Sequence, residues 1–124
     1  MRPIDCFCVQ EDEPGCTFSL SDREGPLLYS VKSKNERWRN IRMQMLAECV
    51  MRQRITEAEK DVGWDGPGAL ICRDQDGYRI RFYSALGNEL AHTGAYANED
   101  QCMKAYKRIF ATLKREYIPM RFYR

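Results

Sequence analysis

The sequence lacks the segments that would place the protein in a membrane or export it. No run of about 18 apolar residues occurs, so no segment is expected to span a bilayer. The first five residues, at positions 1–5, do not form the apolar core of a signal peptide. We therefore expect a cytoplasmic protein that makes no use of a membrane.

Histidine is scarce, and the cysteine spacing typical of zinc sites is absent. His92 is the only histidine, and the six cysteines include no Cys-x-x-Cys pair. Structural zinc sites usually combine two close ligand pairs, and a reducing cytosol disfavours disulfides. We expect free, buried thiols and neither a metal nor a cofactor. Cys102 has one feature of a reactive thiol, since the first turn of a helix lowers a thiol pKa, but a small core residue is the favoured interpretation.

A catalytic set is missing as well. A lone histidine such as His92 is usually a packing residue rather than a base. Acidic residues cluster only in expected turns, at positions 11–13 and at Asp74 and Asp76, where backbone geometry favours Asp. The stretch 63–68 is rich in glycine but does not have the Lys-Ser/Thr ending of a phosphate-binding loop. The sequence therefore predicts a protein that is not an enzyme.

The chain carries enough apolar residues for one core, and it contains an internal repeat. Of its 124 residues 44% are hydrophobic, which suits a single domain. Residues 5–49 match residues 69–113 in their hydrophobic pattern: Phe18 matches Ile80 at a separation of 62, and Trp38 matches Cys102 at 64. We interpret the chain as one domain, residues 1–124, built from two repeats.

Each repeat is predicted to form three strands and a helix. In the second repeat, strands are expected at 70–73, 78–82 and 90–94 from alternation and turn residues. Asn98 is expected to cap the following helix, with Gln101 in the capping box, and Pro119 to end it. The first repeat follows the same plan, with strands at 16–20 and 26–31 and a helix at 35–61. The expected fold is α+β, with repeats at about 5–61 and 69–117, a Gly/Pro linker at 62–68, and helices packed on an antiparallel sheet.

The second repeat resembles a known family. The residues that carry the resemblance are Tyr78-Arg79-Ile80-Arg81-Phe82, Gly87, Leu90-Ala91, Thr93-Gly94-Ala95-Tyr96 and Cys102. They are similar to the YegP-like family of small, tandemly duplicated bacterial proteins, over about a third of the chain. Leu86 precedes Gly87 where Asn is typical, and Gly94-Ala95 precedes Tyr96 where Glu-Gly is typical. The resemblance implies the fold of that family, whose members have no established activity.

The two expected helices differ in their outer faces. At about 100° per residue, the second helix points Cys102, Tyr106, Ile109, Phe110 and Leu113 inward and leaves Lys104, Lys107, Arg108, Ala111, Lys114 and Arg115 outside. The first helix points Trp38, Ile41, Met45 and Cys49 inward, while Met43, Ala47 and Met51 form an apolar line on the opposite side. A helix that is apolar on two sides should be covered on two sides. Three covers fit this pattern: the other repeat, a second copy of the chain, or a foreign protein.

Charge supplies an alternative function. The net charge is only +2, but the last part of the chain is basic and also holds Tyr117, Phe122 and Tyr123. Cations interleaved with aromatic rings can neutralise phosphates and stack on bases. The nucleic-acid contacts predicted on this basis are Lys104, Lys107, Arg108, Lys114, Arg115 and Arg121.

Without a catalytic set, the favoured function is a non-catalytic protein–protein interaction module. Its predicted interface consists of Met43, Ala47 and Met51, because methionine adapts to irregular partners. Such a module could act as a stoichiometric inhibitor, for example a phage protein that blocks a host defence complex. Nucleic-acid binding through the second helix and the tail is the alternative.

Overall fold

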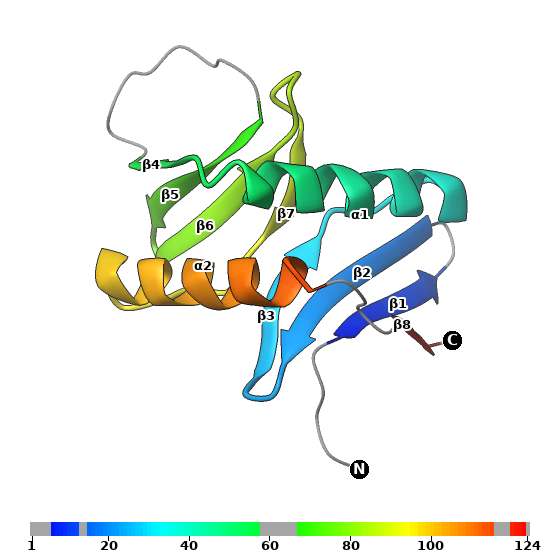
Figure 1. Cartoon of the computed structure of the whole chain (residues 1–124), viewed down its shortest axis with the longest axis horizontal. Helices are drawn as coiled ribbons and strands as arrows, with labels where there is room; N and C mark the ends of the chain where they lie inside the picture. Colours follow the sequence, from blue (N-terminus) through cyan, green and yellow to red (C-terminus); the bar gives the residue numbers. More distant parts are fainter. Residues whose placement is uncertain (1–5, 13–14, 58–66, 116–119, 124) are drawn as a thin grey trace.

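The fold is a single mixed sheet with helices on one face. The computed structural model describes residues 6–12, 15–57, 67–115 and 120–123 (Figure 1). The strands are β1 (Cys6–Asp12), β2 (Gly15–Asp22), β3 (Gly25–Ser30), β4 (Ile55–Glu57), β5 (Gly68–Asp74), β6 (Gly77–Tyr83), β7 (Glu89–His92) and β8 (Met120–Tyr123), and the helices of this part are α1 (Glu36–Met51) and α2 (Glu99–Leu113). The strands form one eight-stranded sheet in the order β4-β5-β6-β7-β3-β2-β1-β8. The predicted α+β fold is confirmed.

The two halves of the chain repeat one order of elements. The order β1-β2-β3-α1-β4 is followed by β5-β6-β7-α2-β8. β4 leaves its own half and pairs in parallel with β5, while β8 pairs in parallel with β1. The halves meet where β3 pairs antiparallel with β7, with Tyr29 opposite His92. Each half therefore completes the sheet of the other, and the prediction missed this fourth strand of each half.

The predicted alignment of α1 with α2 is wrong by one residue. Asn35 caps α1 and Asn98 caps α2, as predicted for Asn98, so the helices correspond at a separation of 63 rather than 64 (98 − 35 = 63). One residue turns a helix by about 100°. Arg39, only 2% exposed, therefore occupies the place predicted for Trp38, which is 48% exposed.

The same shift overturns the predicted apolar line on α1. Met43 is 9% exposed and belongs to the hydrophobic core, whereas Ala47 is half-buried and Met51 is exposed. These three residues do not form one continuous exposed surface. The interface predicted at Met43, Ala47 and Met51 is wrong in this respect, because Met43 faces the sheet.

Helix α1 is also shorter than predicted. It ends at Met51, and Gln53 takes a positive φ of 52° just before β4. A left-handed residue cannot continue a right-handed helix, so the predicted helix to residue 61 is wrong. Of the predicted linker, residues 62–66 lie outside the described residues, as does Pro119, while Gly68 already belongs to β5.

The core lies between the sheet and the helices, which lie side by side over one face (Figure 1). Ile80 and Phe82 of β6 are fully buried under the helices, and the arginines that alternate with them lie on the opposite, open face. Other fully buried side chains of the core are Leu20, Leu28, Leu46 and Ile109. No helix in the described part of the chain is long and apolar enough to cross a membrane.

Candidate interaction surfaces

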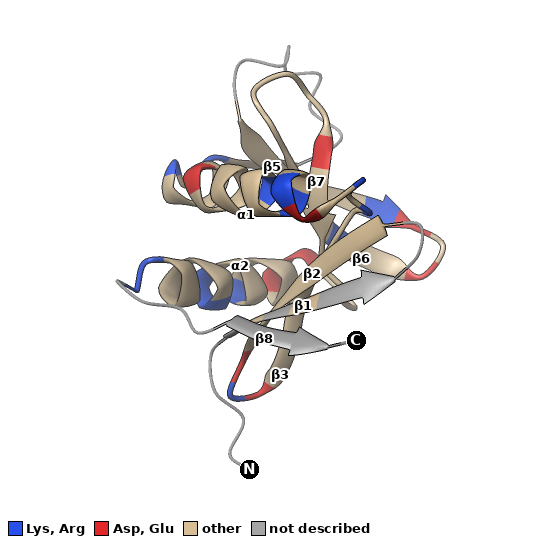
Figure 2. Cartoon of the chain, turned by 90° about the vertical axis from the view of Figure 1, so that its right-hand side faces the viewer, with Lys and Arg blue, Asp and Glu red and all other residues tan. Residues whose placement is uncertain are grey.

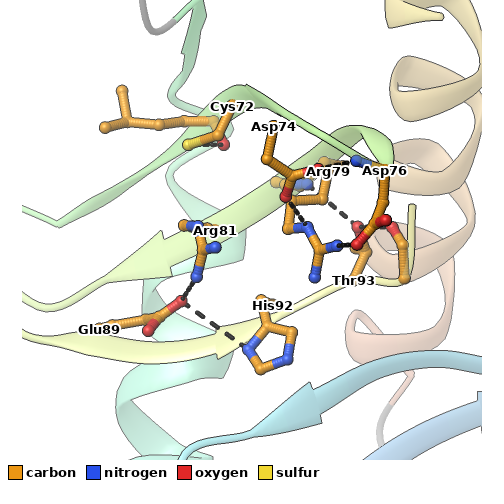
Figure 3. Close-up of polar contacts among 11 residues, drawn as sticks. Cys72, Asp74, Asp76, Arg79, Arg81, Glu89, His92 and Thr93 are labelled. Carbon is orange, nitrogen blue, oxygen red and sulfur yellow. Dashed lines mark hydrogen bonds and ion pairs between the residues drawn. The ribbon is translucent and has the colours of Figure 1, made fainter. Parts of the chain in front are cut away.

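The open face of the sheet carries a chain of paired charges on β5, β6 and β7 (Figure 3). Arg79 Nε lies 2.6 Å from Asp74 Oδ2, and Arg81 donates to Glu89 Oε1 at 2.7 Å. Both guanidinium groups are partly buried, with 18% and 32% of the side chain exposed. The predicted outward direction of these arginines is observed, but each one is neutralised by a neighbouring carboxylate. This face therefore offers little free positive charge.

His92 lies at the seam between the two halves. Its Nδ1 is 3.8 Å from Glu89 Oε1, and its ring lies 6.5 Å from the ring of Tyr29 on β3. Burial lowers the pKa of His92; the charge of Glu89 opposes this shift, and those of Arg81 and Arg79 add to it. The lowered pKa favours the neutral imidazole, which lies between Glu89 on its own strand and Tyr29 on β3.

The lowered pKa of His92 makes the fold sensitive to mild acid. Below the ordinary pKa of 6.5 the unfolded chain takes up a proton that the folded chain resists, so the free energy of unfolding should decrease as pH falls through this range. We expect the decrease between about pH 7 and pH 5, measured by urea denaturation. His92→Gln should reduce it, and an unchanged pH slope in this variant would contradict the prediction. Asp22 and Asp74 have pKa values below the ordinary 3.8 and act only in stronger acid.

The four cysteines whose side chains the structure describes are free. Cys16, Cys49 and Cys102 are buried, and Cys72 is half-buried on the open face. Burial, with a smaller contribution from the charge of Glu99, raises the pKa of Cys102. The thiolate at this helix start is thus disfavoured, which removes the feature of a reactive thiol. Within the described residues, no group of three potential metal ligands comes together.

One flank of α1 exposes apolar side chains, although not those predicted. Trp38, Ile41 and Met45 are spaced three and four residues apart and share this flank. Trp38 is 48% exposed, Ile41 is partly exposed, and Met45 also packs against the core. We call these three residues the Trp38 flank. The prediction missed this flank because it aligned the two helices at a separation of 64 residues. The capping asparagines, Asn35 and Asn98, could have corrected the separation to 63.

The basic back of α2 is present, and Arg108 in it is bound by carboxylates. Lys104, Lys107, Lys114 and Arg115 are exposed, and the positive charge on the helices is visible in Figure 2. Arg108, in contrast, is bound to carboxylates of the β2–β3 hairpin. The side chains of Arg121, Phe122 and Tyr123 are not described, and Tyr117 lies outside the described residues. The predicted nucleic-acid surface is thus brought together only in part.

Arg108 is held by two acidic residues far away in the sequence. Its Nε donates to Asp22 Oδ2 at 2.9 Å and its NH2 to Asp22 Oδ1 at 2.7 Å, and NH2 is also 3.0 Å from Glu24 Oε2. Burial on its own would raise the pKa of Asp22, but the bonds from Arg108 and the backbone N–H of Glu24 hold it below its usual value. Sequence reasoning missed this contact because Asp22 lies in an ordinary turn pattern, 86 residues from its partner.

Comparisons with known proteins identify the fold. No protein-family model matches the chain, and no curated protein matches it. The solution NMR structure of yegP from E. coli, a protein of unknown function, is similar with a TM-score of 0.74 and 10% identity, over 98% of this chain and 97% of that one. A UPF0339 protein from Shewanella oneidensis is similar with a TM-score of 0.71 and 10% identity, over 98% and 93% of the two chains. The YegP-like fold implied by the sequence is confirmed, and these similarities concern the fold alone.

Proposed function

We propose that the protein is a non-catalytic protein–protein interaction module whose partner binds over the Trp38 flank of α1. The observation that carries the proposal is the exposure of Trp38, 48% of which faces solvent on a regular helix. Single exposed apolar residues are common, but Ile41 and Met45 extend the apolar surface along the same flank. Tryptophan is enriched among residues that dominate binding energies at protein interfaces.

The surroundings of the Trp38 flank indicate the chemistry of the partner. Lys34 and Arg37 are exposed beside it, and Arg42 is held in place by hydrogen bonds to Ser33 Oγ at 2.8 Å and to the Lys32 carbonyl at 3.2 Å. The rim is mainly basic, and Glu48, three residues after Met45, is its exposed acidic residue. Such a surface suits a partner with an apolar pocket and a mainly acidic rim. The whole chain, with this rim included, has a net charge of +2, so a second copy is not an acidic partner as a whole, and the proposal commits to a foreign partner.

Within this proposal, the module acts as a stoichiometric inhibitor. A phage protein that blocks a host defence complex is one example of such an activity. An inhibitor of this kind needs a rigid surface that covers its target, and it needs no catalytic group.

Changing Trp38 to Gln should abolish most partner binding. A central interface tryptophan contributes about 2 kcal/mol or more, equivalent to roughly 30-fold in affinity. The measurement is quantitative retention of binding proteins on the tagged protein from native lysate treated with nuclease. Tyr29→Thr is a matched control, because Tyr29 is 46% exposed on the opposite face of the sheet. Equal retention by both variants would refute the site.

The same variants distinguish a foreign partner from self-association. If the wild-type protein is a dimer by light scattering and Trp38→Gln is a monomer, a second copy occupies the flank. A monomeric wild-type protein with Trp38-dependent retention supports the foreign partner.

A second candidate function is nucleic-acid binding through α2. It is favoured by Lys104, Lys107 and Lys114, which remain exposed along one helix. Arg108 contributes little to it, because two carboxylates neutralise it. Retention of nucleic acid, or of proteins that disappear after nuclease treatment, would select this function instead.

A further inference from the structure

A groove lies between the tip of the β2–β3 hairpin and the second half of α2. Its volume is about 430 Å³, and its lining consists of Asp22, Arg23, Glu24, Arg108, Ala111, Thr112 and Arg115. We call it the hairpin groove. The small side chain of Ala111 leaves room between the charged groups, and the Thr112 hydroxyl is occupied by a 2.9 Å bond to the Arg108 carbonyl. The recognition chemistry of the groove therefore rests on its charges.

The two carboxylates that hold Arg108 differ in how firmly they are placed. Asp22 makes two parallel hydrogen bonds to the guanidinium group, and its side chain is only 14% exposed. Glu24 makes a single contact of 3.0 Å, and its side chain is 73% exposed. Asp22 thus sets the orientation of Arg108, whereas the carboxylate of Glu24 can be exchanged for another at little cost, because exposed ion pairs are weak.

We propose that the hairpin groove receives an acidic side chain of a protein partner, and that Glu24 occupies this place in the free protein. The inference rests on the proposed function and names the partner chemistry at a second point of contact. When Glu24 turns outward, Arg108 keeps Asp22 as its partner and can offer its NH2 to a new carboxylate, beside the exposed Arg23. A guanidinium group matches the planar geometry of a carboxylate.

The position of the groove along α2 strengthens the attraction for acidic residues. Lys104, Arg108, Ala111 and Arg115 follow one stripe of the helix at spacings of four, three and four. Lys104 and Arg115 thus extend the positive charge beyond both ends of the contact to Arg108. An acidic partner segment can place further carboxylates along this stripe.

The composition of the groove favours a protein over a nucleic acid. Asp22 stays in the groove, and Glu24 stays at its rim. A nucleic acid brings a negative charge at every nucleotide, so its neighbouring phosphates would face these carboxylates. The carboxylates of an acidic peptide, in contrast, lie on flexible side chains that can turn away from Asp22 and Glu24, whereas phosphates are fixed in the nucleic-acid backbone.

The test compares a fluorescein-labelled polyglutamate peptide with a labelled oligothymidine of equal length, by fluorescence anisotropy on the full-length protein. We expect Glu24→Gln to tighten polyglutamate binding by about 2- to 5-fold, since it removes a competing surface ion pair. Arg23→Ala should weaken it by a similar factor. Glu48→Gln is the matched control: it removes the same charge from an exposed site on α1 and should change binding less.

Three results would overturn the inference: no binding of polyglutamate, an equal response to Glu24→Gln and Glu48→Gln, or an equal effect of Glu24→Gln on oligothymidine binding. Amide chemical shifts give a second readout, because polyglutamate should perturb Arg23, Glu24 and Ala111 and leave Tyr29 unchanged. If these tests fail while partner retention still depends on Trp38, only the groove is refuted. If retention does not depend on Trp38 but the groove binds polyglutamate, the Trp38 flank is refuted.

Discussion

Replacing Phe82 by alanine is expected to destabilise the protein by about 3–5 kcal/mol. Phe82 is fully buried in the core, and its ring stacks on Tyr106 of α2 with centroids 6.4 Å apart and planes 12° apart. Its strand neighbours on either side are Ala69 and Ala91, whose small side chains cannot fill the space left by the ring. The loss therefore combines lost burial with a cavity between sheet and helix.

The measurement is the free energy of unfolding from urea denaturation of Phe82→Ala and the wild type. Leu86→Ala is the control, because Leu86 is 87% exposed at the tip of the β6–β7 hairpin and should change stability by less than about 0.5 kcal/mol. A loss below about 1 kcal/mol in Phe82→Ala would mean that the core is not packed as described.

Gly77→Ala is expected to cost about 1–3 kcal/mol from backbone strain alone, and more from crowding. Gly77 has a φ of 131°, which side chains rarely adopt, and a Cβ at this position would meet the carbonyl oxygen of Tyr96. That carbonyl accepts a hydrogen bond from Tyr78 N at 2.8 Å, and Tyr96 N donates to the Tyr78 carbonyl at 2.6 Å. The substitution therefore strains the turn and disrupts the bridge that ties the start of β6 to the segment before α2.

Substitutions at two other glycines separate the cost of backbone strain from the cost of crowding. Gly25 also has a positive φ, of 124°, but nothing lies within 4 Å of a Cβ there, so Gly25→Ala measures strain without crowding. Gly94 has open space and no positive φ, so Gly94→Ala should be close to neutral. Thermal or urea denaturation should rank the losses as Gly77, then Gly25, then Gly94. A loss at Gly94 equal to that at Gly77 would contradict the assignment.

Local patterns were enough for three strands of each half and for the cap of α2. The alternation of Ile80 and Phe82 with Arg79 and Arg81 predicted β6 and its buried face, because side chains of a strand point alternately to its two sides. Asn98 caps α2 as predicted, and the Gln101 side chain accepts from the backbone N–H of Ala97 at 3.0 Å. These features depend on neighbours within a few residues.

Local patterns were not enough to predict which side chains form the candidate surfaces. An error of one residue in the alignment of the two repeats rotated the predicted α1 by about 100°. The prediction placed Trp38 in the core and Met43 on the surface, whereas the structure exposes Trp38 and buries Arg39 and Met43. The hydrophobic pattern could not reveal the error, because α1 has apolar residues on two sides and carries a buried arginine, Arg39, on the side that faces the core. In α2, where apolar and charged residues separate cleanly, most of the predicted faces are observed.

By itself, the sequence determined the α+β class, the repeated order of strands and helix, and the resemblance in fold, since these follow from local propensity and periodicity. Only the tertiary structure decided that β4 and β8 cross to the other half, that Trp38 faces outward, and that Arg108 is bound by Asp22 and Glu24. The physical reason is that each of these contacts joins residues far apart in the chain. Pairing at a sheet edge and pairing of charges depend on which segments become neighbours, and short-range patterns do not contain that information.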